Sequence, residues 1–518
     1  MDRHETKKWR FAAAAIALAA NAFAQNPPGI PDESTIAELT RRMADGELTS
    51  HAIVAHYLER IAAIDKAGPA INAVIELNPE ALKIADALDA ERKSGKVRGP
   101  LHGIPVLVKD NISSADAMHT SAGSLALAGS IPAQDATVVA RLREAGAVIL
   151  GKTNLSEWAN FRSTHATSGW SGRGGQTRNP YALDRNPCGS SSGTGAAIAA
   201  NLAAVGVGTE TDGSIVCPSA TNGLVGIKPT LGLVSRAGIV PIAHSQDTAG
   251  PMARSVADAA LLLGVLAGAD KRDPATRDAD AHRTDYTKDL DAGGLRGMRI
   301  GIVRKLAGFS PDVDAVLAAN IEALKAAGAV VVDPVEIPNL GKYDEAELLV
   351  LQYEFKHDIN AYLAGLPAGA NVPRSLADLI AFDERERARE MPWFDQDLFE
   401  QSQKRGDLDS RIYRNALVKS KTLAGEIGID DALRWHRLDA LAAPTGGPAW
   451  VIDWVNGDHT VGGSSTPAAV AGYPDITVPA GFVHGLPVGL SFFGAAWSEP
   501  TLIRIAYAFE QATHVRQP

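Results

Sequence analysis

The stretch that decides the fold is ATVVARLREAGAVILGKTN, residues 136–154. Its first half places Val138, Val139 and Leu142 at the spacing of an amphipathic helix, and Gly146 ends that helix. The apolar residues 147–150 then have the length and composition of a buried strand. A helix that leads through a glycine into a buried strand is a typical unit of an α/β protein.

The same alternation of helices and strands continues on both sides of this stretch. Further strands are expected at residues 72–77, 297–303 and 329–333 and within residues 101–112, where the strand ends at Lys109. Further helices are expected at residues 79–95 and 312–328, and two more near the N-terminus, the first capped by Ser34 or Thr35 and the second near Thr49 or Ser50. Because strands that alternate with helices usually lie parallel, the pattern predicts an α/β fold. We expect a single large α/β/α layered domain around a mixed, mostly parallel open sheet.

The composition excludes some classes of partner. The chain has 518 residues, of which 45% are hydrophobic and 21% are charged, as is ordinary for a globular protein. Its formal net charge is -10, and no block of Lys and Arg stands out. Nucleic acids and anionic membrane surfaces attract a basic face, so we expect neither partner.

Residues 1–24 have the three parts of a secretory signal peptide. Basic residues within the first ten positions precede an apolar run that starts at Phe11, and Ala22-Phe23-Ala24 has the form of a cleavage site. The apolar run is too short to span a bilayer. We therefore expect export to the periplasm or the exterior, with removal of the signal peptide near Ala24. The mature chain would comprise residues 25–518 and would contain no membrane span.

Cys188 and Cys217 are the two cysteines of the chain. An oxidising compartment would permit a disulfide between them. Cysteine is also among the residues most often buried as a free thiol, and we expect two buried free thiols here.

Two local patterns imitate known catalytic or binding motifs. Residues 146–153 match the phosphate-loop pattern, but the residues between the two glycines are apolar and belong to an expected strand. Residues 189–193 match a nucleophile elbow centred on Ser191, but a polar, proline-broken segment precedes them where an elbow needs a buried strand. The chain has no HExxH pair and no Cys/His ligand spacing, so we expect no metal and no cofactor.

Three other features carry groups that could do chemistry. The small residues of TETDGSI, 209–215, favour a turn whose successive N–H groups point at one spot, which would stabilise an oxyanion beside a nucleophilic Ser214. The Ser/Gly loop at 189–193 leads into an Ala-rich helix, whose start gathers polar groups and N–H donors. Lys109 ends an apolar strand. Taken alone, each feature is more often a turn, a helix cap or a lysine that reaches solvent.

Taken together, these features resemble the amidase signature family of hydrolases. The resemblance extends from about residue 34 to the C-terminus and rests on long motifs in the family's order, among them GPLHGIPVLVKDNI, GAVILGKTNLSEWA, CGSSSGTGAAIAA, GTETDGSI and AGYPDITVPAGFVHGLPVGLSFFG. The chain looks most similar to the peptide-amidase branch, whose members remove the amide from peptide C-terminal carboxamides.

The resemblance implies a Ser–cis-Ser–Lys triad. Ser214 would be the acyl-forming serine, and Ser190, 24 positions earlier, would be the relay serine with a cis peptide bond beside it. Lys109 would be the base, because burial would keep its amine neutral. The implied oxyanion hole consists of the backbone N–H groups of Thr211, Asp212, Gly213 and Ser214.

Three residues depart from the family's common pattern, and the peptide-amidase branch is similar in these positions. Asp212 stands where Gly is usual, and aspartate tolerates a positive φ better than most residues. Val216 stands where the family has an Arg that binds a substrate carboxylate, so we expect a preference for uncharged amide ends. Cys188 stands where Gly is usual.

The sequence thus predicts a hydrolase that cleaves carboxamide C–N bonds in a small-molecule or peptide amide substrate. Alternatives within the family are an aryl-acylamide or fatty-acid-amide hydrolase and the amidase subunit of a tRNA-dependent amidotransferase. That subunit is cytosolic and needs partner subunits, which the export signal disfavours. An alternative of another class is an exported solute-binding protein without catalysis, which would not need a buried Lys109 near two serines.

Overall fold

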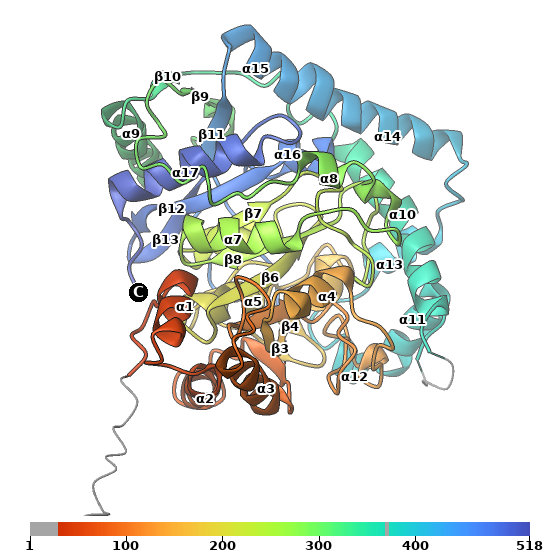
Figure 1. Cartoon of the computed structure of the whole chain (residues 1–518). Helices are drawn as coiled ribbons and strands as arrows, with labels where there is room; N and C mark the ends of the chain where they lie inside the picture. The colour runs from red at the N-terminus through yellow and green to blue at the C-terminus, as the bar shows by residue number, and fades with distance from the viewer. Residues whose placement is uncertain (1–28, 368–371) are drawn as a thin grey trace, which may run out of the picture.

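The computed structural model describes residues 29–367 and 372–518, so the predicted signal peptide of residues 1–24 lies outside the described residues. One open sheet of eleven strands runs through the molecule (Figure 1). From edge to edge its strands are β1 (Val74–Leu77), β3 (Val148–Thr153), β2 (Pro105–Lys109), β6 (Val205–Glu210), β8 (Thr248–Ala253), β7 (Val225–Lys228), β12 (Asp475–Val483), β13 (Leu486–Phe493), β11 (Ala440–Pro444), β9 (Arg299–Ile302) and β10 (Val330–Val332).

The single α/β domain with a mixed open sheet is confirmed, but parallel pairing is less extensive than we expected. The parallel pairs form two groups, β3–β2–β6 and β11–β9–β10. The other six neighbouring pairs in the described part of this eleven-stranded sheet are antiparallel. One reason is the short turn at His484-Gly485 between β12 and β13, because so short a turn joins only antiparallel strands.

Helices cover the sheet and complete the predicted layers (Figure 1). In one layer α4 (Thr137–Glu144), α7 (Val256–Leu266), α17 (Glu499–Thr513) and α9 (Pro311–Ala326) contact one another in succession. In another, α5 (Ser192–Ala199) contacts α6 (Val216–Thr221), and α10 (Asp344–Ala364) packs on α13 (Asp397–Gln403) and α14 (Arg411–Ala424). The remaining α-helices are α1 (Ile36–Ala44), α2 (Ser50–Arg60), α3 (Ala81–Lys93), α8 (Ala279–His282), α11 (Leu376–Arg385), α12 (Arg387–Glu390), α15 (Asp430–His436) and α16 (Thr466–Ala471).

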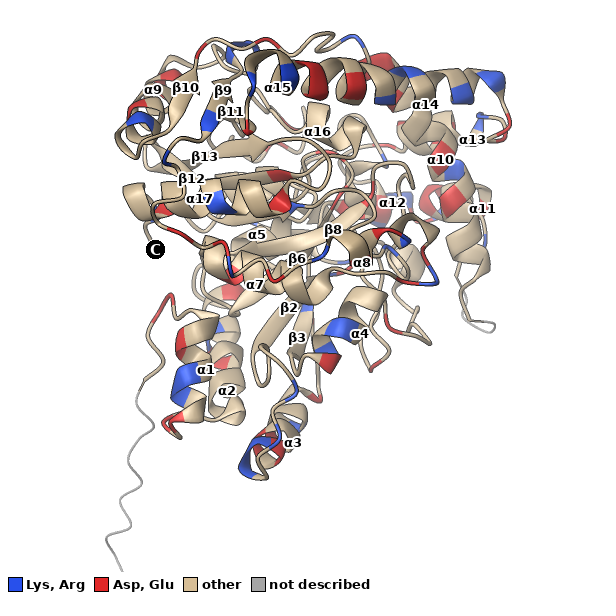
Figure 2. Ribbon diagram, turned by 45° about the horizontal axis from the view of Figure 1, so that its top comes forward, with Lys and Arg blue, Asp and Glu red and all other residues tan. Residues whose placement is uncertain are grey.

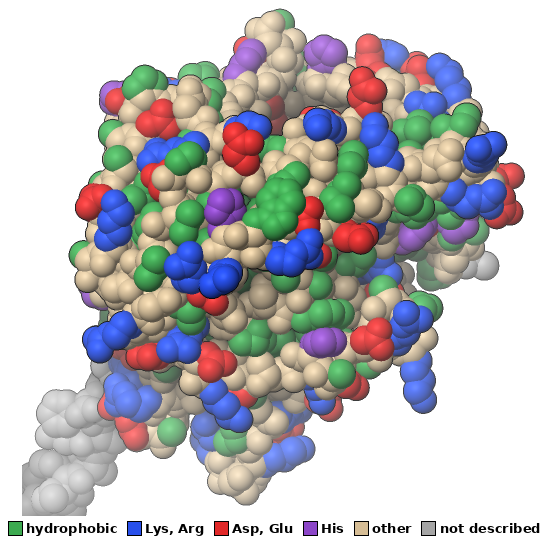
Figure 3. Space-filling model, turned by 90° about the horizontal axis from the view of Figure 1, so that it is seen from above, with side chains coloured by type: hydrophobic (Ala, Val, Ile, Leu, Met, Phe, Trp, Pro, Cys, Tyr) green, Lys and Arg blue, Asp and Glu red, His purple; other side chains and the backbone are tan. Residues whose placement is uncertain are grey.

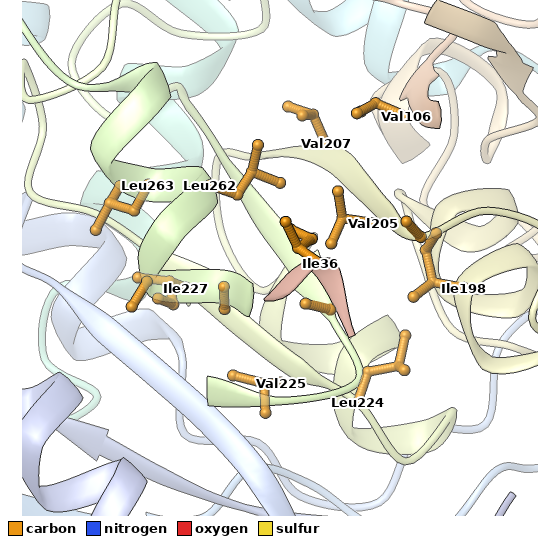
Figure 4. Close-up of a cluster of buried hydrophobic side chains, with 14 of the residues drawn as sticks. Ile36, Val106, Ile198, Val205, Val207, Leu224, Val225, Ile227, Leu262 and Leu263 are labelled. Atoms are coloured by element: carbon orange, nitrogen blue, oxygen red, sulfur yellow. The ribbon is translucent and has the colours of Figure 1, made fainter. Parts of the chain in front are cut away.

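The core lies where the central strands meet these helices. Figure 4 shows valines of β2 and β6 beside Leu262 and Leu263 of α7 and Ile198 of α5. Every residue of α5 is buried, and its small side chains let it lie directly on β6. A Cβ atom at Gly206 of β6 would come within 2.5 Å of the Thr194 methyl of α5, so the close approach requires glycine there. This packing fixes the helix that begins just after the Ser/Gly loop.

The elements expected from the sequence form close to their predicted bounds. β3 occupies the apolar segment of the false phosphate-loop motif, as expected. Helix α1 is capped by Thr35, whose hydroxyl accepts from the Glu38 N–H at 3.2 Å. Helix α2 is capped by Thr49, whose hydroxyl accepts from the Ala52 N–H at 3.1 Å.

Charged residues lie mainly on the outer helices, whereas the central strands carry few (Figure 2). On the face seen from above, acidic and basic side chains are interspersed (Figure 3). Within the described part of the chain, no helix is both long and apolar enough to cross a membrane.

Candidate active site

Lys109 is placed by the sheet at a point where two parallel strands end. It is the last residue of β2, which pairs in parallel with β6, and Thr209 lies near the end of β6. The Lys109 Nζ atom donates to the Ser190 hydroxyl at 2.7 Å and to the Thr209 hydroxyl at 2.9 Å. Lys109 and Ser190 are both fully buried. The structure thus brings together the predicted base and the predicted relay serine.

Burial lowers the pKa of Lys109 to about 7, although the negative charges of Glu210 and Asp247 act in the opposite direction. A lysine in this range is neutral in a large fraction of molecules near neutral pH, and a neutral amine can accept a proton. The Lys109 Nζ atom is therefore suited to act as a base toward the Ser190 hydroxyl that it contacts.

This pKa predicts how activity depends on pH. Only the neutral amine accepts a proton, so kcat/KM should fall by about tenfold for each pH unit below about pH 7. The measurement is kcat/KM for an amide substrate from about pH 5 to about pH 9, with circular dichroism at each pH to show that the fold persists. A flat profile on a folded protein would contradict the assignment of Lys109 as the base.

Ser190 lies in a loop with an unusual backbone. The Gly189–Ser190 peptide bond is cis, which confirms the cis bond that the family resemblance implies. The neighbouring Ser191 is fully buried, and its hydroxyl donates to the Thr209 carbonyl at 3.0 Å. The segment that leads directly into Ser191 is not a strand. Ser191 therefore lacks the context of a nucleophile elbow, in agreement with the prediction from the sequence.

Ser214 lies in the turn between β6 and α6, and Glu210 organises this turn. The two carboxylate oxygens of Glu210 accept from the N–H groups of Gly213 at 2.9 Å, Ile215 at 2.7 Å and Val216 at 3.0 Å. Glu210 is fully buried. This role was not predicted from the sequence, although Glu210 lies inside the TETDGSI segment, 209–215.

The implied oxyanion hole is altered by this arrangement. Because the Gly213 N–H already donates to Glu210, it is not free for a substrate in this structure. Within residues 29–367 and 372–518, the N–H groups of Thr211, Asp212 and Ser214 have no hydrogen-bond acceptor. The positive φ of the turn, 78°, belongs to Gly213 and not to Asp212. Three of the four predicted donors are thus available.

The hydrogen-bond network of Lys109 reaches Ser190 but does not continue to Ser214. Among the described residues, no hydrogen bond joins the two serine hydroxyls. The two segments are nevertheless adjacent, because the Ser191 N–H donates to the Ser214 carbonyl at 3.2 Å. Ser214 is 8% exposed, whereas Ser190 is fully buried, so Ser214 is the more accessible of the two.

Two cavities adjoin these segments. The first, of about 290 Å³, is lined by Ser190, Thr209 and Thr211 and by apolar residues between positions 237 and 242. The second, of about 270 Å³, is lined by Gly189, Asp212 and the loop around residues 445–465. Both cavities therefore leave room for a substrate next to the serine-bearing segments.

Cys188 and Cys217 form a disulfide, so the expectation of two free thiols was wrong. They are 29 positions apart in the sequence, but the serine loop and the start of α6 lie together, which brings their Cα atoms to 6.0 Å. The bond joins the residue before Gly189 to a residue just after Ser214. It ties the two serine-bearing segments to each other.

One group of side chains near the first cavity has the composition of a metal site. His244, His357 and Asp358 place candidate ligand atoms within 4.8 Å of one another. The two Asp358 oxygens already engage Nδ1 of His244 and Nδ1 of His357, each at 2.8 Å. A carboxylate shared between two imidazoles explains the cluster without a metal, and we assign none.

A lysine of lowered pKa bonded to a buried serine, beside a cavity at the carboxyl ends of parallel strands, is an arrangement typical of a hydrolytic active site. The family can be stated as well. The family described as Amidase matches residues 52–503, and the chain belongs to this family. It therefore hydrolyses amide C–N bonds.

Individual relatives support this assignment. The structure of native peptide amidase from Stenotrophomonas maltophilia aligns with a TM-score of 0.88 and 54% identity, over 94% of this chain and 98% of that chain. A probable amidase of Arabidopsis thaliana is 44% identical, over 94% of this chain and 91% of its own length. A glutamyl-tRNA(Gln) amidotransferase subunit of Roseiflexus castenholzii is 36% identical, over 93% of this chain and 97% of its own length.

Proposed function

We propose that the protein hydrolyses the C-terminal amide of peptides through an acyl-enzyme on Ser214. The observation that carries the proposal is the 2.7 Å hydrogen bond from Lys109 Nζ to Ser190 Oγ beside the Ser214 turn. Neutral Lys109 accepts the Ser190 proton while Ser190 accepts the proton of Ser214, whose oxygen attacks the amide carbonyl. This step requires the two serine hydroxyls to move into hydrogen-bond contact when substrate binds.

The later steps use the same groups in reverse. The carbonyl oxygen becomes an oxyanion and accepts from the N–H groups of Thr211 and Asp212, which have no protein acceptor among the described residues. The proton returns from Lys109 through Ser190 to the leaving nitrogen, and ammonia departs as the C–N bond breaks. A water molecule then gives its proton to the same relay and attacks the acyl ester, which releases the peptide acid and frees Ser214.

The second cavity supports a neutral amide end as the substrate. Val216, which stands where the family has an Arg, lines this cavity, and so do Asp212 and Asp458. Among the described residues, its lining contains no Lys or Arg. A substrate carboxylate would find acidic groups and no cation there, whereas a carboxamide carries no charge.

Two measurements test the proposal. An aryl phosphonate, which reacts with activated serines, should label Ser214 and no other serine, as read by mass spectrometry of digested protein. Label on Ser190 or Ser191 instead would refute the assigned nucleophile. Peptide amides should release ammonia faster than anilides or fatty amides release their amines, and faster release from anilides or fatty amides would favour the aryl-acylamide or fatty-acid-amide alternative.

We also propose that the protein is exported. The signal-peptide pattern of residues 1–24 and the Cys188–Cys217 disulfide support this proposal, because disulfides persist mainly in oxidising compartments. Export would also disfavour a role in a cytosolic tRNA-dependent amidotransferase. Fractionation should find a shortened chain, with an N-terminus near Gln25, outside the cytoplasm, and full-length cytoplasmic protein would contradict the proposal.

A further inference from the structure

The aspartate that departs from the family pattern has a dense set of partners. Asp212 accepts from the Ser465 hydroxyl at 2.5 Å and from the Thr466 hydroxyl at 2.7 Å, one to each carboxylate oxygen. Both hydroxyls lie at the start of α16. Asp212 therefore ties the Ser214 turn to a segment 253 residues further along the chain.

A second carboxyl group, from a third segment of the chain, contacts Asp212. Glu347, a buried residue in the first turns of α10, is hydrogen-bonded to Asp212. The Gln246 side-chain amide donates to Glu347 Oε1 at 2.9 Å and to the Thr211 carbonyl at 3.3 Å. Glu347 is thus connected to the serine turn at two points, directly at Asp212 and through Gln246 at Thr211.

Two carboxyl groups that are hydrogen-bonded to each other must share one proton, because two ionised carboxylates offer no donor and repel each other. Burial and the negative charge of Asp212 raise the pKa of Glu347 well above its ordinary value. Burial raises the pKa of Asp212 as well, but Asp212 accepts from two hydroxyls, which favours its charged form. The proton therefore resides on Glu347, which donates to Asp212 and accepts from Gln246.

We propose that Glu347 is a positioning residue for amide hydrolysis, whose protonated carboxyl, held between Gln246 and Asp212, fixes the turn that presents Ser214 and the N–H groups of Thr211 and Asp212. The inference rests on the roles proposed for this turn. Glu347 touches no reacting atom in this scheme. It acts by keeping the backbone of the turn in one conformation.

Other ionisable groups lie near Asp212 and Glu347, and a pH experiment must distinguish their titration from that of Glu347. At the start of α10 they are Asp344 and Tyr343, the residue just before the helix. From other elements they are Lys228 of β7, Glu210 of β6 and Asp475 of β12. Two more are Asp247, which accepts from the Thr211 hydroxyl at 2.6 Å, and Lys421 of α14, which donates to the carbonyl of Ser245 at 2.7 Å. These groups remain in every variant used below.

The test compares the pH dependence of kcat and KM in the wild type and in Glu347→Gln. Glutamine can donate to Asp212 and accept from Gln246 at every pH, whereas glutamic acid loses its proton at alkaline pH. We expect an alkaline fall in kcat in the wild type and its absence in Glu347→Gln. Glu345→Gln, an exposed position on the same helix, is the matched control and should keep the wild-type profile.

A second variant measures the size of the effect. Glu347→Ala removes both contacts and should lower kcat at least about tenfold with KM within about twofold. An alkaline limb that is the same in Glu347→Gln as in the wild type would overturn the inference, and so would a wild type without that limb. If Glu347→Ala does not fold, the glutamine variant still decides. Phosphonate labelling of the wild type, run alongside, reports separately on whether Ser214 is the nucleophile.

Discussion

Replacing Lys109 with alanine is expected to lower kcat by about 10³-fold or more while the protein stays folded. In the proposed relay Lys109 Nζ receives the proton from Ser190, and the Thr209 hydroxyl beside it is too weak a base to replace it. Members of a proton relay act as a unit, so losing one member removes the benefit of the others. The measurement is kcat for the substrate that the wild type turns over best.

The controls for this prediction separate chemistry from packing. Lys109→Met keeps most of the side-chain volume without the amine and should lose as much activity as Lys109→Ala. Lys152→Met is the matched control, because Lys152 is also fully buried, lies opposite Val108 on the neighbouring strand, and donates to the Ile112 carbonyl and the Thr120 hydroxyl. It should keep kcat within about tenfold per folded molecule. Near wild-type activity in Lys109→Met would refute the relay.

The strands and the position of Lys109 could be predicted from the sequence, because they depend on the pattern of neighbouring residues along the chain. The apolar run before Lys109 has the length of a buried strand, so Lys109 lies at the carboxyl end of that strand. The parallel pairing of β2 with β6 then brings Lys109 to Thr209, a hundred residues away. The position of Ser190 relative to Lys109 came from the family resemblance and could not have come from periodicity.

Other parts of the site could not be predicted, because they depend on the direction in which side chains point. Glu210 ends a strand whose residues are buried on both faces, so alternation along the strand does not tell whether its carboxylate faces the turn. Its contact with the Gly213 N–H removes one predicted oxyanion donor. The Cys188–Cys217 pairing likewise depends on two loops meeting, and two cysteines 29 positions apart do not reveal that.

The second large effect is expected at Glu210, where replacement by alanine should lower the stability of the protein. The change leaves the buried N–H groups of Gly213, Ile215 and Val216 without an acceptor. Each lost bond to a charged acceptor costs about 1.5–3 kcal/mol, although water that enters the space offsets part of this. We expect a loss on the order of 3 kcal/mol or more, measured by thermal and urea unfolding. Glu322→Ala, an exposed residue paired with Lys325, should change stability by less than about 0.5 kcal/mol.

Glu210→Gln removes the negative charge of this residue but keeps its size and one side-chain oxygen as an acceptor. The glutamine oxygen still accepts from part of the turn, so this variant should be more stable than Glu210→Ala. The negative charge of Glu210 raises the pKa of Lys109, and removing that charge should lower this pKa further below the wild-type value of about 7. The acid limb of kcat/KM should therefore move to lower pH in Glu210→Gln, because Lys109 stays neutral further into the acid range. An acid limb that stays in place or moves to higher pH would mean that the group titrating in the rate profile is not Lys109.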